Sequence, residues 1–134
     1  MSGDRKEQVQ VMVVDDEAIA VKTLQRILSK GGYQVEAFQD PHQALSRLDQ
    51  KSFDIVVTDV VMGDIDGIQV LERARQTSPR TRVIIITAFA MMDLARKAME
   101  KGAFDFVAKP FDAQAIREMV DRAAKELAGE PGDR

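Results

Sequence analysis

Short runs of apolar residues alternate along the chain with longer segments in which apolar residues recur every three or four positions. The runs, rich in Val and Ile, lie at residues 9–14, 34–38, 54–58, 82–86 and 103–107. Such runs favour buried strands, whereas the three-to-four spacing is typical of amphipathic helices. Strands that alternate with helices in this way indicate a parallel sheet covered on both faces.

Capping residues mark the ends of the predicted helices. Asp40 before Pro41 combines a preferred N-cap residue with proline at the first helical position. Gly102 and Gly129 follow later helical segments and predict that the helices end there. The first helix is expected to carry its apolar residues at helical spacing: Ile19, Leu24, Ile27 and Leu28. Right-handed crossovers then predict a flavodoxin-like (βα)5 fold, a doubly wound sheet with strand order 2-1-3-4-5.

Length and composition are those of one globular domain. The chain has 134 residues, of which 45% are hydrophobic, a net charge of -3 and no cysteine; it is long enough to bury a core without disulfides. The small net charge argues against direct nucleic-acid binding. The apolar stretch at 83–92 is too short to span a bilayer, and the polar residues 1–8 lack the apolar core that is typical of a secretion signal. We expect a cytoplasmic domain at 9–128, short polar tails at 1–8 and 129–134, and no membrane partner.

Polar residues close or follow four of the apolar runs. Asp15 and Asp16 follow the first run, Asp59 the third, Thr87 the fourth and Lys109 the fifth. In a doubly wound sheet the carboxyl ends of the strands meet at one edge, and strands one and three are neighbours at the switch point. We therefore expect three carboxylates, a hydroxyl and an amine to converge there.

Three carboxylates at one edge require a counter-charge. Unit like charges about 4 Å apart repel by roughly 4 kcal/mol at an effective dielectric constant of about 20. A bound cation or a raised proton affinity must offset that repulsion. An all-oxygen set beside an incoming phosphate suits Mg²⁺, which takes only one or two protein carboxylates. Taken alone, Asp15 and Asp16 are also typical of a helix N-terminus.

The motifs around these positions resemble one known family. They are Val11 to Asp16, Asp59 with Met62 and then Asp66-Gly67, Thr87-Ala88, and Lys109-Pro110-Phe111. In this order and spacing they are similar to the receiver domain of two-component response regulators, of the chemotaxis-regulator type, from about residue 9 to 127. The resemblance implies a phosphoprotein of a phosphorelay that carries an aspartyl phosphate on Asp59.

The resemblance also implies a role for each site residue. Asp16 and Asp59 would bind Mg²⁺ directly, Asp15 mainly through water, and the carbonyl of Val61 would complete the protein ligands. Lys109 would offset charge on the transferring phosphoryl oxygens. A cis peptide bond between Lys109 and Pro110 would direct its amine toward the phosphate.

Two further residues would form the switch. The hydroxyl of Thr87 would bond a phosphoryl oxygen and draw its loop inward. Phe106 would be the aromatic that turns inward when Thr87 moves; the alternative reading is a core strand residue.

The implied partners are proteins. A histidine kinase or phosphotransfer protein would supply the phosphoryl group, and a downstream protein would bind the face of helix four, strand five and helix five. A homodimer that forms on phosphorylation is a further partner to consider. The chain would catalyse its own phosphorylation and slow dephosphorylation, but it would otherwise be a signalling protein and not an enzyme.

The chain departs from the family pattern beside the phosphoacceptor. Gly63 stands where receivers commonly have proline, which widens backbone freedom in that loop. Val61 and Phe89 occupy two positions that tune phosphoryl lifetime in receivers. We hypothesise that these apolar groups impede an attacking water. His42, the only histidine, is assigned no role.

Three alternatives remain open. A haloacid-dehalogenase-type phosphatase also uses aspartate, Thr, Lys and Mg²⁺, but it requires Asp-x-Asp after strand one and usually a cap insertion. A receiver-like scaffold would bind its partners independently of phosphate. A flavodoxin shares the predicted fold, but no hydroxyl- and glycine-rich phosphate loop follows strand one.

Overall fold

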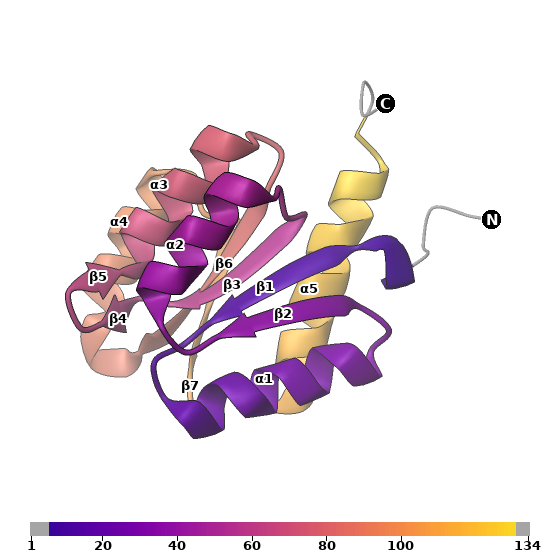
Figure 1. Ribbon diagram of the computed structural model, residues 1–134. Helices are drawn as coiled ribbons and strands as arrows, with labels where there is room; N and C mark the ends of the chain where they lie inside the picture. Colours follow the sequence, from indigo (N-terminus) through magenta and orange to yellow (C-terminus); the bar gives the residue numbers. More distant parts are fainter. Residues whose placement is uncertain (1–5, 131–134) are drawn as a thin grey trace.

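A parallel sheet between two layers of helices forms the chain from residue 6 to residue 130, the part that the computed structural model describes (Figure 1). The strands of the sheet are β1 Gln10–Val14, β2 Gln34–Phe38, β3 Ile55–Asp59, β6 Arg82–Ala88 and β7 Asp105–Lys109. They are all parallel and lie in the order β2-β1-β3-β6-β7. This confirms the predicted flavodoxin-like fold.

Five α-helices cover the two faces of the sheet. They are α1 Ala18–Lys30, α2 Pro41–Gln50, α3 Gly67–Thr77, α4 Met92–Glu100 and α5 Ala113–Ala128. Helices α1 and α5 lie on one face, and α2, α3 and α4 lie on the other (Figure 1). The side chains of Asp40, Asp66 and Asp112 accept hydrogen bonds from backbone N–H groups at the starts of α2, α3 and α5. Each such cap stabilises its helix by about 1 kcal/mol.

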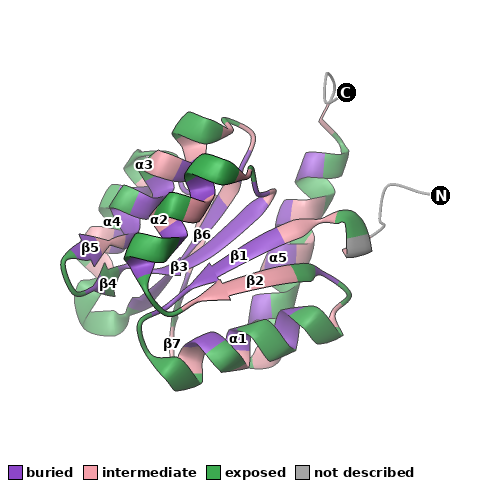
Figure 2. Cartoon of the chain, viewed as in Figure 1, coloured by how far each residue is buried: buried purple, intermediate pink, exposed green. Residues whose placement is uncertain are grey.

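The core lies on both faces of the central strands, which Figure 2 shows as buried. Met12 and Val14 of β1 pack toward α2, α3 and α4, whereas Val11 and Val13 pack toward α1 and α5. Because both faces are covered, the strand reads as a continuous apolar run instead of an alternating one.

Three strands end later than their apolar runs predict. Strand β3 ends at Asp59 instead of residue 58, β6 continues to Ala88, and β7 covers residues 105–109 in place of 103–107. The parallel register runs on through the pairs Asp59 with Ile86 and Ala88 with Lys109. Pairing with the neighbouring strand, not hydrophobicity, therefore sets these ends, and Asp59 and Lys109 stand on strands instead of flexible loops.

Ile19 lies on α1, as predicted, but outside the buried stripe of this helix. Its side chain is 82% exposed, whereas Val21, Leu24 and Leu28 form the buried stripe of α1. Two residues of a helix turn through roughly 200°, so Ile19 and Val21 point to opposite sides.

A short hairpin follows β3 that the sequence pattern did not predict. Its strands are β4 Val61–Met62 and β5 Ile65–Asp66, joined through Gly63 at φ 68°. Two-residue strands are too short to show a periodicity. Gly63 supplies the positive φ that other residues rarely adopt.

Two 3₁₀ turns complete the described elements, η1 Lys6–Gln8 and η2 Phe89–Met91. Residues 1–5 and 131–134 of the predicted tails lie outside the described residues, so the domain limits 9–128 stay predictions. In the described part of the chain, no helix has the length and apolar character needed to cross a bilayer.

Candidate functional site

Three aspartates meet at the carboxyl edge of the sheet. Val14 pairs with Thr58 in the β1–β3 register, so the next residues, Asp15 and Asp59, come out side by side. One carboxylate oxygen from each of Asp15, Asp16 and Asp59 lies within 4.8 Å of the others. The topology thus brings together the carboxylates that the sequence pattern placed at this edge.

The ammonium group of Lys109 lies among these carboxylates. Its Nζ is 2.9 Å from Asp59 Oδ2, 3.2 Å from Asp15 Oδ2 and 3.3 Å from Glu17 Oε1. The bond from Lys109 to Pro110 is cis, as the resemblance implied. The cation at the end of β7 thereby contacts Asp15 and Glu17, which follow β1, and Asp59, the last residue of β3.

Burial and the neighbouring opposite charges shift the pKa values of Asp15 and Lys109 in opposite directions. Asp15 is fully buried, Asp59 keeps 8% of its surface exposed, and Asp16 is exposed. Burial raises the pKa of Asp15, and the charge of Asp59 adds to this, against the N–H of Glu17 and the Lys109 ammonium. Burial would lower the pKa of Lys109, but the hydrogen bond to Asp59 and the charges of Asp15 and Asp59 raise it. The ammonium therefore stays charged at neutral pH.

Glu17 is a site residue that the sequence reasoning missed. Its carboxylate contacts Lys109, and its N–H donates a 3.0 Å hydrogen bond to Asp15 Oδ1. It also occupies the N-cap position of α1, without a side-chain capping bond, so Asp15 and Asp16 do not cap that helix. The signal available was a run of three acids, of which only the first two were used.

Thr87 lies near the end of β6 at the same edge of the sheet, whereas Phe106 lies within β7, opposite Ile85. The buried hydroxyl of Thr87 donates to the carbonyls of Ala88 at 3.0 Å, at the end of β6, and of Met91 at 3.3 Å, in η2. Phe106 is half-buried and packs against the core beneath α2, α3 and α4. The switch roles of these two residues stay predictions.

The first residue of α3, Gly67, packs closely against the backbone of Asp59. A Cβ on Gly67 would lie 2.6 Å from the carbonyl oxygen of Asp59, so only glycine fits there. Val61, two residues after Asp59, is 44% exposed, and its N–H lies 3.4 Å from Asp59 Oδ1. The phosphoacceptor candidate is thus held by its own strand, by α3 and by the hairpin.

His42 pairs with an acid outside the cluster. Its Nε2 lies 3.1 Å from both carboxylate oxygens of Asp64, and both side chains are exposed. This contact joins α2 to the β4–β5 hairpin and adds no member to the site.

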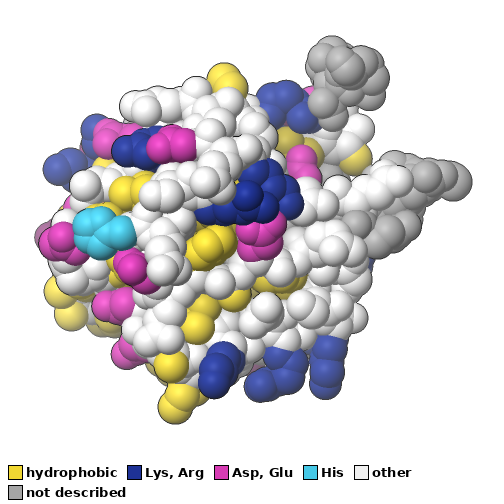
Figure 3. All heavy atoms as spheres, viewed as in Figure 1, with side chains coloured by type: hydrophobic (Ala, Val, Ile, Leu, Met, Phe, Trp, Pro, Cys, Tyr) yellow, Lys and Arg dark blue, Asp and Glu magenta, His cyan; other side chains and the backbone are white. Residues whose placement is uncertain are grey.

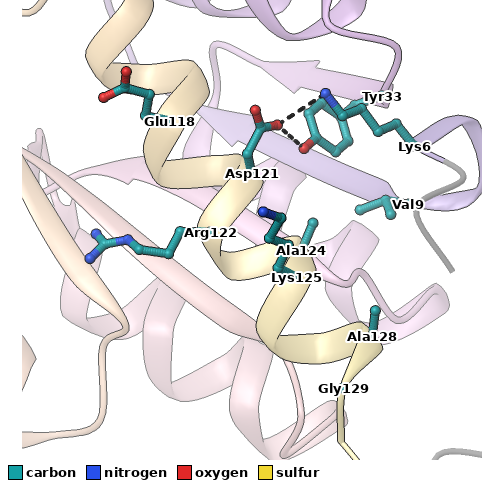
Figure 4. A pocket seen from close by; sticks show the side chains of 10 residues that line it. All are labelled: Lys6, Val9, Tyr33, Glu118, Asp121, Arg122, Ala124, Lys125, Ala128 and Gly129. Atoms are coloured by element: carbon teal, nitrogen blue, oxygen red, sulfur yellow. Dashed lines mark hydrogen bonds and ion pairs between the residues drawn. The ribbon is translucent and has the colours of Figure 1, made fainter.

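A cavity of about 710 Å³ lies at the other end of the sheet, beside η1 and α5 (Figure 4). The hydroxyl of Tyr33 donates to Asp121, and the ammonium of Lys6 lies 3.4 Å from the same carboxylate. Lys6 also lies over the Tyr33 ring. Because these polar groups satisfy one another, the acidic cluster and not this cavity is the candidate functional site.

Comparison with known proteins decides the family. The protein-family model for the response regulator receiver domain matches residues 11–121 of the sequence. The chain belongs to this family. This receiver domain is 34% identical over 116 residues to the transcriptional regulatory protein ZraR of Salmonella typhimurium, covering 87% of the chain and 26% of ZraR. It is 35% identical over 113 residues to the DNA-binding transcriptional regulator NtrC of the same organism, covering 84% and 24%. The chain thus spans about a quarter of these relatives.

Solved receiver structures share the fold. A response regulator receiver domain protein from Clostridium thermocellum is 28% identical with a TM-score of 0.83, over 88% of this chain and 95% of that one. Full-length FixJ from B. japonicum is 33% identical with a TM-score of 0.83, over 92% and 60%. The chain is therefore a response regulator receiver domain, a signalling module of two-component systems. Membership supports phosphorylation-dependent signalling.

Proposed function

We propose that this receiver domain is a switch in which Asp59 accepts a phosphoryl group from a histidine kinase or a phosphotransfer protein. One observation carries the proposal: the carboxylate of Asp59, a residue with 8% of its surface exposed, lies at a strand end, 2.9 Å from the ammonium of Lys109. A nucleophilic oxygen beside a fixed cation is the arrangement that phosphoryl transfer requires.

The transfer is an in-line displacement on phosphorus. A carboxylate oxygen of Asp59 forms the new P–O bond while the P–N bond of a phosphohistidine breaks. The imidazole leaves with the bonding electron pair and takes up a proton from water. Lys109 offsets negative charge on the transferring oxygens, and Asp15, buried behind it, holds the ammonium in place at 3.2 Å.

The donor set of the cluster fits Mg²⁺. Asp16 and Asp59 would be its direct ligands, Asp15 would act mainly through water, and the carbonyl of Val61 would complete the protein share. Three carboxylates, those of Asp15, Glu17 and Asp59, contact the ammonium of Lys109. Asp16 lies close to Asp15 and Asp59, so the acids of this cluster outnumber the cation that they are seen to contact. Bound Mg²⁺ would neutralise charge on the phosphoryl oxygens and on these acids.

The readout would begin at Thr87. Its hydroxyl now donates to the carbonyls of Ala88 and Met91, and on phosphorylation it would turn to a phosphoryl oxygen and draw η2 inward. Phe106 would then move into the space that opens, so that the phosphate shifts a pre-existing equilibrium. The altered face of α4, β7 and α5 would bind a downstream protein, or a second phosphorylated copy of the chain.

Mass spectrometry with a small phosphodonor tests the proposal. Acetyl phosphate with Mg²⁺ should add one phosphoryl group to the wild-type chain and none to Asp59→Asn, and chelation of Mg²⁺ should suppress the product. Equal incorporation in Asp59→Asn would place the acceptor elsewhere. Phosphorylation that leaves the binding of every captured partner unchanged would favour the phosphate-independent scaffold.

A further inference from the structure

One edge of the sheet is open along β2. In the described part of the chain this strand pairs only with β1, and no other strand lies on its outer side. The N–H of Gln34 and the carbonyl of Phe38 bond to the residues directly before and after β1. The alternate residues, Val35 and Ala37, therefore direct their N–H and C=O groups outward. We call this outer side of Gln34–Phe38 the β2 edge.

The side chains beside the β2 edge are mostly apolar. Val35 and Ala37 pack on the α1 side of the sheet, whereas Phe38 packs on the α2 side. All three are half-buried, and Figure 2 shows β2 as less buried than the neighbouring strand β1. Proline and free charged side chains commonly protect an edge strand from pairing with another chain. Strand β2 contains no proline, and its one charged residue, Glu36, is paired with two cations on the α2 side.

A hollow of about 340 Å³ lies beside the carboxyl end of β2. It is lined by the ring of Phe38 and by polar side chains of α2, among them Gln43, Ser46 and Arg47. A strand added along the β2 edge would point its successive side chains to opposite faces of the sheet. Those on the α2 side would enter the hollow, where an apolar group would be covered from water against Phe38.

Helix α1, on the other side of β2, presents a row of cations. Lys22, Arg26 and Lys30 are exposed and follow one another at four-residue spacing, so they lie along one face of the helix. Among residues 6–130 none of the three contacts an acidic side chain, and α1 itself contains no acid. Figure 3 shows basic side chains over α1 and others at the end of α2, with hydrophobic side chains over β2 between them. The β2 edge thus lies between two basic regions.

We propose that the β2 edge is a docking site for an extended, acidic segment of a partner protein, which would add to the sheet as a further strand. The backbone of this segment would bond to Val35 and Ala37, and one of its apolar side chains would fill the hollow beside Phe38. Its acidic side chains on the opposite face would be attracted by Arg26 and Lys30. Docking here needs no phosphorylated aspartate, so the site is separate from the switch.

Charge selects an acidic segment over a second copy of the chain. Two copies that paired antiparallel through β2 would be related by a twofold axis normal to the sheet, which places both α1 helices on the same face. The cations of the two helices would then lie in one basic region and repel each other. An acidic segment would bond to the same backbone groups and would be attracted by those cations instead.

The test uses a defined peptide and the wild-type chain. The probe is a short peptide with capped ends in which glutamate alternates with valine, with phenylalanine at the central apolar position. Amide hydrogen exchange, measured by NMR at low ionic strength, reports its binding. In the free chain the N–H groups of Val35 and Ala37 should exchange faster than that of Glu36, which bonds to β1. At a peptide concentration ten times the Kd, exchange at Val35 and Ala37 should slow about tenfold.

Two N-methylated peptides show whether the peptide binds as a strand. One carries N-methyl groups on its glutamates and the other carries them on its apolar residues, so each lacks one alternate set of backbone donors. A strand that pairs with the β2 edge directs only one of these sets toward it. One control peptide should therefore bind about tenfold more weakly than the parent peptide, and the other should retain its affinity.

Charge reversal on α1 tests the electrostatic contribution. The double variant Arg26→Glu, Lys30→Glu should bind the parent peptide about tenfold more weakly than wild type does. The matched control reverses two exposed cations on other helices, Lys97→Glu on α4 and Arg117→Glu on α5, and changes the net charge by the same amount. It should bind within about twofold of wild type, because salt screens distant charges.

Several results would overturn the inference. They are equal binding of all three peptides, unchanged exchange at Val35 and Ala37 when the peptide is bound, and equal losses in the two charge-reversal variants. Failure of the parent peptide to bind at up to about 1 mM would also overturn it. Dimerisation of the free chain with protection of the same two amides would assign the β2 edge to a second copy instead.

Discussion

Two clusters of charged side chains in this domain have opposite balances. Glu36 on β2 lies between two cations, 2.8 Å from Arg47 and 2.9 Å from Lys51. The hydrogen bond from Arg47 leads the causes that lower the pKa of Glu36 to about 2. At the carboxyl edge of the sheet, burial and the charge of Asp59 raise the pKa of Asp15, although it too has a cation partner.

The difference separates a stabilising cluster from a functional one. Two cations serve one acid at Glu36, so ionisation of that acid favours the fold. Several acids share Lys109, and ionisation of the buried Asp15 works against the fold. Titratable groups held in an unfavourable balance are typical of functional sites. Variants that remove one charge from each cluster should therefore have different consequences.

The largest effect is expected for Lys109→Met. Loss of the ammonium should slow phosphorylation by acetyl phosphate by about a hundredfold, because it removes one stabilising group from the transition state. The free energy of unfolding in Mg²⁺-free buffer should fall by about 2 kcal/mol, since buried Asp15 loses its cation while Lys109 itself was only partly buried. Urea denaturation and initial phosphorylation rates measure the two effects.

The control is Lys51→Met, which leaves Glu36 paired with Arg47. It should leave the phosphorylation rate unchanged and lower the stability by less than Lys109→Met does. If the two variants lose the same activity, the clusters do not differ in function and the comparison fails.

The central residues of the site could be predicted from the sequence, whereas the contacts of the residues around them could not. Asp15 and Asp59 could be predicted because adjacent parallel strands bring their ends together whatever the side-chain details. The run of three acids points to Glu17 as well, but its contact with Lys109 could not be predicted, because that contact depends on a side-chain rotamer at the exposed start of α1. The exposure of Ile19 could not be predicted from helical spacing alone, because spacing does not show that the buried stripe of α1 begins at Val21.

A smaller effect is expected at the apolar side chains next to the phosphoacceptor. The double variant Val61→Asn, Phe89→Glu should lose its phosphoryl group about tenfold faster than wild type, because polar groups there can hold an attacking water near Asp59. Release of inorganic phosphate from the purified phosphorylated chain, after removal of acetyl phosphate, gives the rate. Slower or equal release in the variant would show that Val61 and Phe89 do not shield the acyl phosphate.

Mg²⁺ should reverse the charge imbalance of the edge cluster and leave the Glu36 cluster unaffected. At a Mg²⁺ concentration ten times its Kd, the free energy of unfolding should rise by about 1.4 kcal/mol. Asp16→Asn should lose most of this gain. Asp93→Asn, which removes an almost fully exposed acid on α4, should keep it. Thermal unfolding with and without Mg²⁺ measures the gain; an equal gain in Asp16→Asn would mean that the ion acts elsewhere.

The smallest effect is expected for Glu36→Gln in acid. The pKa of Glu36 in the folded chain, about 2, lies below its ordinary value of 4.5, so its stabilising contribution is present above about pH 4.5 and is lost as the pH falls toward 2. Wild type should therefore lose about 1 kcal/mol more stability than Glu36→Gln between about pH 6 and 3, since the pair is partly screened by solvent.

Asp15→Asn should change the same acid titration in the opposite sense. The raised pKa of Asp15 means that its charge costs stability near neutral pH and that protonation removes this cost as the pH falls. Replacing Asp15 should thus steepen the acid loss that replacing Glu36 makes shallower. Urea denaturation across the acid range, in Mg²⁺-free buffer, measures both. If the free energy of unfolding changed with pH in the same way in both variants, the two acids would affect acid stability in the same sense. The contrast between the two clusters would then not hold.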